Sequence, residues 1–284
     1  MTLHTLIDAH ALNERIERGD VLVVDCRSDI ADAQRGAREY AAAHIPGAEF
    51  ADLNRDLSDL SRAGLGRHPL PGAAAFCALL ARWGWHPGLG VVAYDAANGA
   101  LAAARLWWMM RLIGASDAAV LDGGIAAWSA AGRPLSTLRA ERAPSEVARD
   151  FDAAQIVYSD ELRRLREGTQ TVLIDARAAP RYRGEVEPID PVAGHVPGAV
   201  NRPFADNLSA DGLFKPPAQL RDEFAQLLGT HAARDVVHMC GSGVTACHNL
   251  LAMEHAGLSG SRIYAPSWSG WIADPQRPVA RAQQ

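Results

Sequence analysis

The sequence predicts an α/β protein built from two homologous domains, each a parallel sheet flanked by helices. The first observation behind this prediction is that short β-branched runs, such as VLVVD at 21–25, alternate with segments of helical pattern. Continuous apolar strands separated by helices are typical of a parallel sheet that helices cover on both faces. The second observation is an internal repeat that extends over both halves of the chain.

Segments of the first half recur, in the same order, in the second half. VLVVDCRSD (21–29) recurs as TVLIDARAA (171–179), AHIPGAEF (43–50) as GHVPGAVN (194–201), and VVAYDAANGA (91–100) as VVHMCGSGVTA (236–246). Equivalent residues lie 145 to 151 positions apart, about half of the 284-residue chain, which indicates two copies of one domain and not a solenoid of short units. We therefore expect domains at 1–135 and 153–284, joined by a polar linker at 136–152.

The elements of each copy follow the same order. In the first copy we expect strands at 21–25, 91–95 and 118–121, with a long helix over 100–114. In the second copy we expect strands at 171–175, 199–204, 235–239 and 261–265, with a helix over 244–257. Ligands of such sheets gather at the carboxyl ends of the strands, and Cys240 lies at one of those ends.

Composition excludes several classes of function. With 48 % hydrophobic and 21 % charged residues, the chain has ample material for a core. The formal net charge of −5 and the isoelectric point near 6.0 argue against binding of nucleic acid. The amino-terminal segment carries no export signal, and the most apolar stretch, 101–115, contains Arg105 and Arg111 and is too short to span a bilayer. We expect a cytoplasmic protein that does not bind membranes.

The sequence contains four cysteines, at positions 26, 77, 240 and 247. They are too few and too scattered for a disulfide framework, and their spacing from one another and from histidines does not match a metal site. We therefore expect reduced thiols and neither a metal nor an organic cofactor.

The CGSGVTA segment at 240–246 has the composition of an anion-binding loop. Gly241 and Gly243 allow backbone conformations in which successive N–H groups turn inward around the sulfur. The helix that follows adds its positive end, which favours the thiolate of Cys240 at neutral pH. The alternative is a small buried residue at the end of a strand, the commoner role of a lone cysteine. In the first copy Asp95 replaces Cys240, so that half has no sulfur nucleophile.

Two chemistries use a cysteine in such a loop. A cysteine phosphatase needs an arginine six residues after the cysteine to hold the phosphoryl oxygens, and here that position is Ala246. The other chemistry is transfer of a sulfur atom, in which the thiolate accepts a sulfane sulfur and holds it as a persulfide.

At this point the sequence resembles the tandem-domain sulfurtransferases, which comprise thiosulfate sulfurtransferases (rhodaneses) and 3-mercaptopyruvate sulfurtransferases. The resemblance rests on the D-x-R motifs at 25–27 and 175–177, the HIPGA and HVPGA turns, LDGGIAAW at 121–128, CGSGVTA, and YAPSWSGW at 264–271. It covers nearly the whole chain. It implies two rhodanese-like domains, of which only the second is catalytic.

The resemblance also implies roles for individual residues. Cys240 matches the persulfide-forming nucleophile, and the residues Gly241, Ser242, Gly243, Val244 and Thr245 match the loop whose amides bind the persulfide. Arg181 matches an arginine that binds the anionic end of the donor, and Arg183 is a weaker candidate for the same role.

Other matches bear on the choice of donor. Ser242 matches a serine of the mercaptopyruvate enzymes, and His68 falls where those enzymes have the histidine that partners it. The third member of that set, an aspartate, falls on Asn54, and an amide cannot stabilise an imidazolium as a carboxylate does. A second donor-binding arginine falls on or near Ile189. The loop therefore favours mercaptopyruvate, whereas Asn54 and Ile189 argue against it.

Several conspicuous residues have simpler interpretations. We expect His44 and His195 to form hydrogen bonds within their turns, and Cys26, Cys77 and Cys247 to be packed in the core. Trp268 and Trp271 could shield the site from water, although Trp128 in the first copy indicates a packing role for one of them.

The sequence thus predicts a sulfurtransferase that moves a sulfane sulfur from thiosulfate or 3-mercaptopyruvate to a thiophilic acceptor, such as cyanide or a thiol, through a Cys240 persulfide. Small thiols and thioredoxin-like proteins are candidate acceptors. The alternative, from another class, is a non-catalytic binding or redox-sensing module that carries sulfur to a protein partner.

Overall fold

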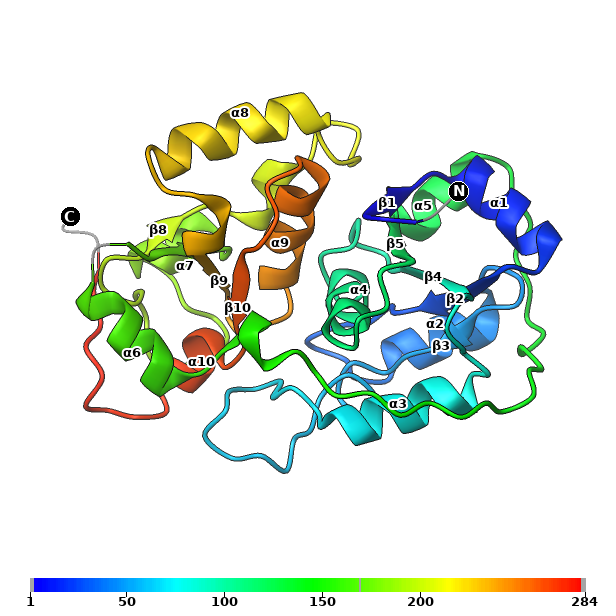
Figure 1. Ribbon diagram of the computed structural model, residues 1–284, viewed down its shortest axis with the longest axis horizontal. Coiled ribbons are helices and arrows are strands. Elements are labelled where there is room, and N and C mark those ends of the chain that lie inside the picture. Colours follow the sequence, from blue (N-terminus) through cyan, green and yellow to red (C-terminus); the bar gives the residue numbers. More distant parts are fainter. Residues whose placement is uncertain (1–2, 169, 282–284) are drawn as a thin grey trace. The chain divides into compact units, whose positions relative to one another are not determined.

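The computed structural model describes residues 3–168 and 170–281 (Figure 1). The contacts group them into two compact units. The first unit contains the chain up to Asp59, together with Leu70–Asp152 and Gly212–Phe214. The second contains Leu60–Pro69, Ala153–Asp211 and the chain from Lys215 onward. A ten-residue segment of the amino-terminal half, Leu60–Pro69, therefore packs with the unit that carries Cys240.

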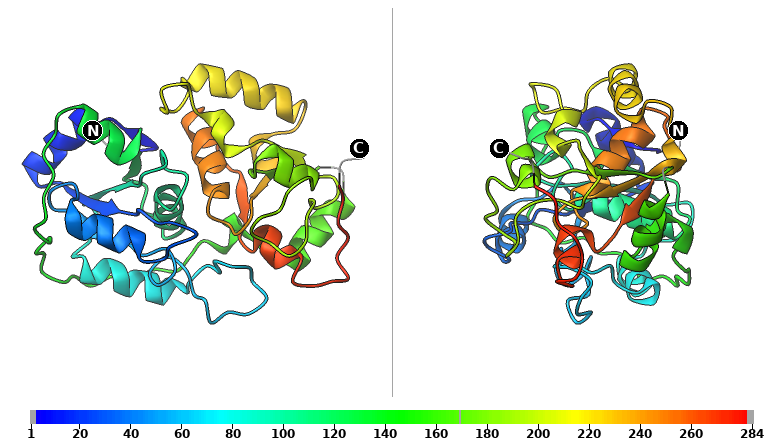
Figure 2. Two further views of the ribbon diagram at one scale, coloured as in Figure 1. Left: turned by 180° about the vertical axis from the view of Figure 1, so that it is seen from behind. Right: turned by 90° about the vertical axis from the view of Figure 1, so that its left-hand side faces the viewer.

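The two units repeat one sheet topology. The strand order is β1-β5-β4-β2-β3 in the first unit and β6-β10-β9-β7-β8 in the second, and the strand pairs are parallel in both sheets. Helices lie on both faces of each sheet (Figures 1 and 2). The predicted fold class, two α/β domains with parallel sheets, is confirmed.

The elements of the first unit begin with a two-residue strand and end with the short helix that follows the LDGG turn. Its strands are β1 (Leu6–Ile7), β2 (Val21–Asp25), β3 (Glu49–Phe50), β4 (Gly90–Tyr94) and β5 (Ala118–Leu121). Its helices are α1 (Ala9–Arg18), α2 (Arg35–Ala42), α3 (Ala73–Arg82), α4 (Ala103–Leu112) and α5 (Gly124–Ala130).

In its described residues, the second unit has the same order of strands and helices, with three short 3-10 turns. Its strands are β6 (Ile156–Val157), β7 (Val172–Asp175), β8 (Val200–Asn201), β9 (Val236–Met239) and β10 (Arg262–Tyr264). Its helices are α6 (Ser159–Glu167), α7 (Ala179–Arg183), α8 (Pro217–Leu228), α9 (Ala246–His255) and α10 (Ser267–Trp271), and the 3-10 turns are Ala153–Gln155, Phe204–Asn207 and Ala233–Asp235.

The cores explain why the strands are apolar without alternation. In the second unit, one face of the sheet packs side chains of β7, β9 and β10 against Leu162 of α6 and Trp268 and Trp271 of α10. Helix α9 contacts β9, β10 and α8 instead, and its residues from Ala246 to Met253 are buried. Both faces of β9 are therefore covered, and the residue that follows β9 is held by rigid elements.

The repeated D-x-R motif forms a buried ion pair in each unit. Arg27 donates to the carboxylate of Asp25 and, through Nη2, to the carbonyl oxygen of Ala43 at 2.6 Å. Arg177 donates likewise to Asp175, and its Nη2 reaches the Gly194 carbonyl oxygen at 2.7 Å. Each arginine thus ties the end of a strand to the start of the H-x-P-G turn, which is why these two motifs recur together.

The two turn histidines have structural contacts, as the sequence predicted. The His44 ring stacks on Tyr40 at 4.1 Å between centroids, and its Nδ1 lies 2.7 Å from the Tyr40 carbonyl oxygen. The His195 ring stacks on Tyr182 at 3.9 Å, with Nδ1 2.8 Å from that residue's carbonyl oxygen.

The helices of the described ranges are all too short or too polar to cross a bilayer.

Candidate active site

Cys240 lies directly after β9, at the start of the loop that leads into α9. Its N–H donates to Ser267 Oγ at 3.1 Å, and its carbonyl oxygen accepts the Trp268 N–H at 3.0 Å. The Gly243 N–H points at the sulfur, with the nitrogen 3.2 Å from Sγ. A donor N–H aimed at sulfur stabilises negative charge there, so the geometry suits a thiolate or a terminal persulfide.

The two glycines of the loop serve different purposes. Gly243 has a φ of +80°, a left-handed conformation that favours glycine, as the sequence predicted. Gly241 has no positive φ, so the conformational freedom predicted for it is not used, and it lies close to two guanidinium groups instead. A Cβ on Gly241 would come within 3.0 Å of Arg67 Nη2 and 3.7 Å of both terminal nitrogens of Arg181. The helix begins at Ala246, two residues later than predicted, which leaves the whole 240–245 segment as loop.

The equivalent loop of the first unit turns its backbone N–H groups onto the side chain of Asp95. The Asp95 carboxylate accepts five backbone N–H groups, two on Oδ1 and three on Oδ2, at 2.8–3.2 Å. Burial raises the pKa of Asp95, while these amide hydrogen bonds oppose that rise. In the first unit an acceptor side chain thus fills the space between these amides, where the second unit has a nucleophile.

Ser242 and His68 meet in the second unit. Ser242 Oγ lies 2.8 Å from His68 Nδ1, and the serine is nearly buried. His68 belongs to the Leu60–Pro69 segment, and the preceding residue, Arg67, donates its N–H to Ser269 Oγ at 3.0 Å. The structure therefore brings together the Ser242 and His68 pair that the resemblance implied.

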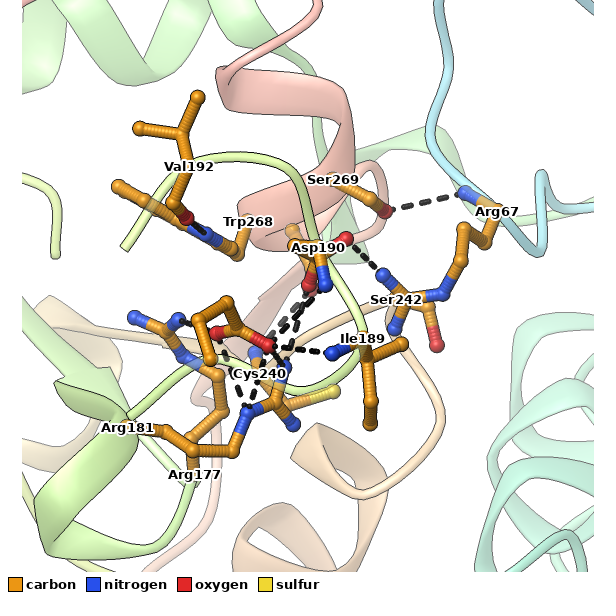
Figure 3. Close-up of polar contacts among 12 residues, drawn as sticks. Arg67, Arg177, Arg181, Ile189, Asp190, Val192, Cys240, Ser242, Trp268 and Ser269 are labelled. Atoms are coloured by element: carbon orange, nitrogen blue, oxygen red, sulfur yellow. Dashed lines mark hydrogen bonds and ion pairs between the residues drawn. The ribbon is translucent and has the colours of Figure 1, made fainter. Parts of the chain in front are cut away.

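Arg181 lies on α7 with its guanidinium directed at the loop (Figure 3). Nε and Nη2 donate to Glu187, the shortest contact being 2.6 Å, and Nη2 also reaches Asp190 Oδ2 at 3.2 Å. Burial would raise the pKa of Glu187, but hydrogen bonds from Arg181 and from backbone amides hold it below the ordinary value. Glu187 is therefore ionised at neutral pH and fixes the arginine.

Arg67 was missed in the sequence interpretation. Its Nη1 forms an ion pair with Asp190 Oδ1, so one carboxylate joins Arg67 to Arg181 (Figure 3). The two arginines are 114 positions apart in the sequence. Arg67 directly precedes His68, which the resemblance placed at the site, and this adjacency was the one signal for Arg67 in the sequence.

The ion pairs form a connected set around the loop. Arg177 joins it through Glu187 at 3.4 Å and through Asp175 at 2.7 Å. The set contains three guanidinium groups, of Arg67, Arg177 and Arg181, and three carboxylates, of Asp175, Glu187 and Asp190. The formal charges of these six groups cancel. A sulfur donor that enters the site therefore meets oriented N–H groups but no net positive charge.

The remaining candidates have other environments. Arg183 lies on the surface, 41 % exposed, in an ion pair with Glu185 at 2.6 Å. Cys247 is buried in α9 with its sulfur 3.5 Å from the Gly243 carbonyl oxygen, and Cys26 and Cys77 are also buried. These cysteine predictions are confirmed, while the expectation that Asn54 supports His68 less well than an aspartate would stays a prediction.

The tryptophans divide as the repeat suggested. Trp128 and Trp271 each donate Nε1–H to a proline carbonyl oxygen, of Pro134 and Pro278, at 2.8 and 3.0 Å, and both pack in the core. Trp268 donates to the Val192 carbonyl oxygen at 2.9 Å, and Arg177 lies over its ring at 4.6 Å. Trp268 therefore holds the chain segment that contains Val192 and, two residues earlier, Asp190.

A cysteine whose sulfur accepts a loop N–H, in the second of two repeated α/β units, defines a class of protein, and comparison with known families identifies it. The model of the rhodanese-like domain matches residues 8–131 and 159–274. The chain belongs to the rhodanese-like family, as a tandem pair of its domains.

The curated relatives are sulfurtransferases. The chain is 48 % identical to the probable 3-mercaptopyruvate sulfurtransferase of Pseudomonas aeruginosa over 99 % of both chains. It is 38 % identical to the putative thiosulfate sulfurtransferase SseB of Mycobacterium tuberculosis, over 97 % of this chain and 96 % of the relative. The solved 3-mercaptopyruvate sulfurtransferase of Leishmania major superposes with a TM-score of 0.82 at 30 % identity, covering 94 % of this chain and 73 % of that one. This chain is an enzyme that transfers sulfur, and the alternative of a non-catalytic module is not favoured.

Proposed function

We propose that the chain transfers the sulfur of 3-mercaptopyruvate to a thiophilic acceptor through a persulfide on Cys240, and that thiosulfate is a second, poorer donor. The observation that carries the proposal is the pairing of Ser242 Oγ with His68 Nδ1 at 2.8 Å beside the Cys240 loop. Two features add support: the Gly243 N–H on the sulfur and the arginines that border Gly241.

In the first half-reaction, the Cys240 thiolate attacks the sulfur of the donor. The new S–S bond forms as the carbon–sulfur bond breaks, and its electron pair leaves on carbon as the enolate of pyruvate. The thiol proton of the donor ends on that carbon, so the products are pyruvate and a Cys240 persulfide anion. With thiosulfate the bond that breaks is sulfur–sulfur, and sulfite leaves with the electron pair.

Ser242 and His68 have a role with mercaptopyruvate that they lack with thiosulfate. The enolate must be protonated before it becomes pyruvate, and a hydroxyl bonded to an imidazole can deliver a proton and recover it. Sulfite needs no proton to leave. A serine and histidine pair next to the nucleophile is therefore useful for the donor that leaves as an enolate.

In the second half-reaction the acceptor attacks the outer sulfur of the persulfide and regenerates the thiolate. Cyanide leaves as thiocyanate, and a thiol leaves as its own persulfide. We include small thiols and thioredoxin-like proteins among the acceptors, and the cytoplasm as the compartment, because no disulfide joins the four cysteines within the described ranges, which suits a reducing environment.

The charge-balanced ion-pair set also favours mercaptopyruvate. Thiosulfate is a dianion, whereas mercaptopyruvate carries a single carboxylate, and a site without net positive charge opposes the dianion more. The name of the Mycobacterium tuberculosis relative, putative thiosulfate sulfurtransferase, supports retaining thiosulfate as a donor.

The test is turnover with both donors side by side, using cyanide as acceptor, in the wild type and in Cys240→Ser. We expect higher kcat/KM with mercaptopyruvate, and loss of turnover with both donors in the variant, because an alcohol offers no thiolate. Higher efficiency with thiosulfate would overturn the donor assignment. Retained turnover in a folded Cys240→Ser protein would overturn the mechanism.

A further inference from the structure

We propose that Ser269 is a positioning residue for the reaction, because it fixes the Leu60–Pro69 segment, and with it His68, against the cysteine loop. The proposal rests on the proposed function, in which His68 acts together with Ser242 on mercaptopyruvate. It gives a role to a hydroxyl at α10, outside the cysteine loop, and it names the contact that holds the histidine in place.

The first support is that the start of α10 is bonded to the cysteine loop. The Cys240 N–H donates to Ser267 Oγ at 3.1 Å, and the Cys240 carbonyl oxygen accepts the Trp268 N–H at 3.0 Å. The Ser269 N–H donates to the Gly241 carbonyl oxygen at 2.9 Å. Three successive residues of α10 therefore bind the first two residues of the loop, so Ser269 has a fixed position relative to the nucleophile.

The second support is that the Ser269 side chain binds the segment that carries the histidine. Its Oγ accepts the Arg67 N–H at 3.0 Å (Figure 3). The next residue, His68, has its Nδ1 2.8 Å from Ser242 Oγ. Ser269 thus binds the cysteine loop through its N–H and the Leu60–Pro69 segment through its hydroxyl. Because the second bond is made one residue before His68, it restrains the backbone from which the imidazole extends.

The third support is the close approach of this segment to α10. A Cβ on Gly66 would come within 2.5 Å of the Pro266 carbonyl oxygen and 2.9 Å of Ser269 Oγ. A Cβ on Gly270 would lie 2.4 Å from Pro266 Cβ and 3.2 Å from the Gly66 nitrogen. Glycine on both sides allows the two backbones to come this close. The Arg67 N–H can reach Ser269 Oγ because no side chain lies between the backbones.

The consequence for catalysis follows from the short reach of proton transfer. A group that delivers a proton must lie about 2.6–3.2 Å from the atom that it serves, and a misplacement of about 1 Å can cost about a hundredfold in rate. Without Ser269 Oγ, the Arg67 N–H loses its acceptor and the backbone at His68 loses a restraint. Sulfite needs no proton to leave, so the loss should affect mercaptopyruvate more than thiosulfate.

The experiment compares Ser269→Ala with Ser269→Thr, which keeps the hydroxyl, in turnover with both donors. We expect kcat with mercaptopyruvate to fall about tenfold in Ser269→Ala, and kcat with thiosulfate to change about threefold or less. Ser269→Thr should stay within about twofold of the wild type. An equal fall with the two donors would overturn the inference, because it would place the effect on the Cys240 loop, which both reactions use.

Two glycines of the segment provide a matched pair of variants. Gly64 and Gly66 have φ values of +78° and +90°, so alanine strains the backbone at either position. Among the described residues, only Gly66→Ala also collides with α10, since a Cβ on Gly64 has no atom within 4 Å. We expect Gly66→Ala to lower mercaptopyruvate turnover more than Ser269→Ala does, and Gly64→Ala to keep wild-type turnover. Equal losses in the two glycine variants would overturn the inference.

The position of His68 is measured without turnover, in a Cys240→Ser background, from its imidazole NMR signals, which are assigned by their absence in His68→Gln. We expect these signals to shift on adding Ser269→Ala or Gly66→Ala, and to stay unchanged on adding Gly64→Ala. If they shift while kcat with mercaptopyruvate keeps its wild-type value, the inference stands and the role of His68 in the proposed function fails. Unchanged signals on adding Ser269→Ala would overturn the inference.

Discussion

Replacing Asp95 with asparagine tests whether the loop of the first unit is built to hold an anion. The carboxylate accepts two N–H groups on Oδ1, from Ala97 and Gly99, and three on Oδ2. An asparagine has one accepting oxygen, which would serve the group of three. The NH2 group of the asparagine would then point at the other two backbone N–H groups, and neither of these would have an acceptor.

The expected magnitude follows from that count. Two amides that lose their acceptor in this loop cost about 1–3 kcal/mol each, and the loss of a charged acceptor adds to this. We therefore expect the first unit to lose about 2–5 kcal/mol of unfolding free energy, or roughly 5–15 °C in its thermal transition. Turnover at 25 °C should change less than about twofold, since the first unit supplies no nucleophile.

The assay is urea and thermal unfolding, followed by turnover of the folded protein with mercaptopyruvate. Asp29→Asn is the matched control, because Asp29 also accepts two amides, from Ala31 and Asp32, at the exposed surface of the same unit. We expect it to lose less than about 1 kcal/mol. If Asp95→Asn has the same unfolding free energy as the wild type, the anion-holding interpretation is refuted. If the folded variant loses turnover, the first unit takes part in the chemistry.

Two further predictions concern the second unit. Burial lowers the pKa of His238 to about 3, whereas the unfolded value is about 6.5. Between these two pH values the unfolded state binds a proton that the folded state does not. The free energy of unfolding therefore decreases as the pH falls from about 6.5 towards 3. The free energy of unfolding is about 2 kcal/mol lower at pH 5 than at pH 7 for this reason, and His238→Gln should remove that difference in urea titrations. The same dependence of unfolding free energy on pH in the wild type and in His238→Gln would contradict the prediction. Ile189→Arg should raise kcat/KM for mercaptopyruvate about ten- to hundredfold, and for thiosulfate less, because a guanidinium there would add a charge-assisted hydrogen bond to the carboxylate. An unchanged ratio between the two donors would mean that residue 189 does not face the donor.

Local sequence predicted the fold well because each repeated motif has a local cause. The Asp175 and Arg177 pair spans two positions, and its counterpart Asp25 and Arg27 does the same. The apolar strands are buried on both faces, so their character is visible without knowledge of their partners. The short strands β1, β3, β6 and β8 carry too few residues to show a pattern, and three of them were not predicted.

The site was predicted only where its residues are near Cys240 in sequence or match the family pattern. Of the two glycines expected to use conformations closed to other residues, Gly243 has a positive φ and Gly241 does not. The reason for Gly241, a guanidinium that approaches from the Leu60–Pro69 segment, depends on a contact between distant parts of the chain. Arg67 had the same obstacle, since its ion pair with Asp190 joins residues 123 positions apart. Such contacts leave no periodicity in a single sequence.

The most direct test of the account is the intact mass of the protein after treatment with mercaptopyruvate and removal of excess donor. We predict an increase by the mass of one sulfur atom, located on Cys240 by peptide mapping, and its complete loss when cyanide is added, with one equivalent of thiocyanate released. All four cysteines are buried. The thiols of Cys26, Cys77 and Cys247 each donate to a backbone carbonyl oxygen, whereas the Cys240 sulfur accepts an N–H, so we expect only Cys240 to be modified. An unchanged mass, or a sulfur atom that persists in Cys240→Ser, would contradict the claim that this enzyme works through a persulfide on Cys240.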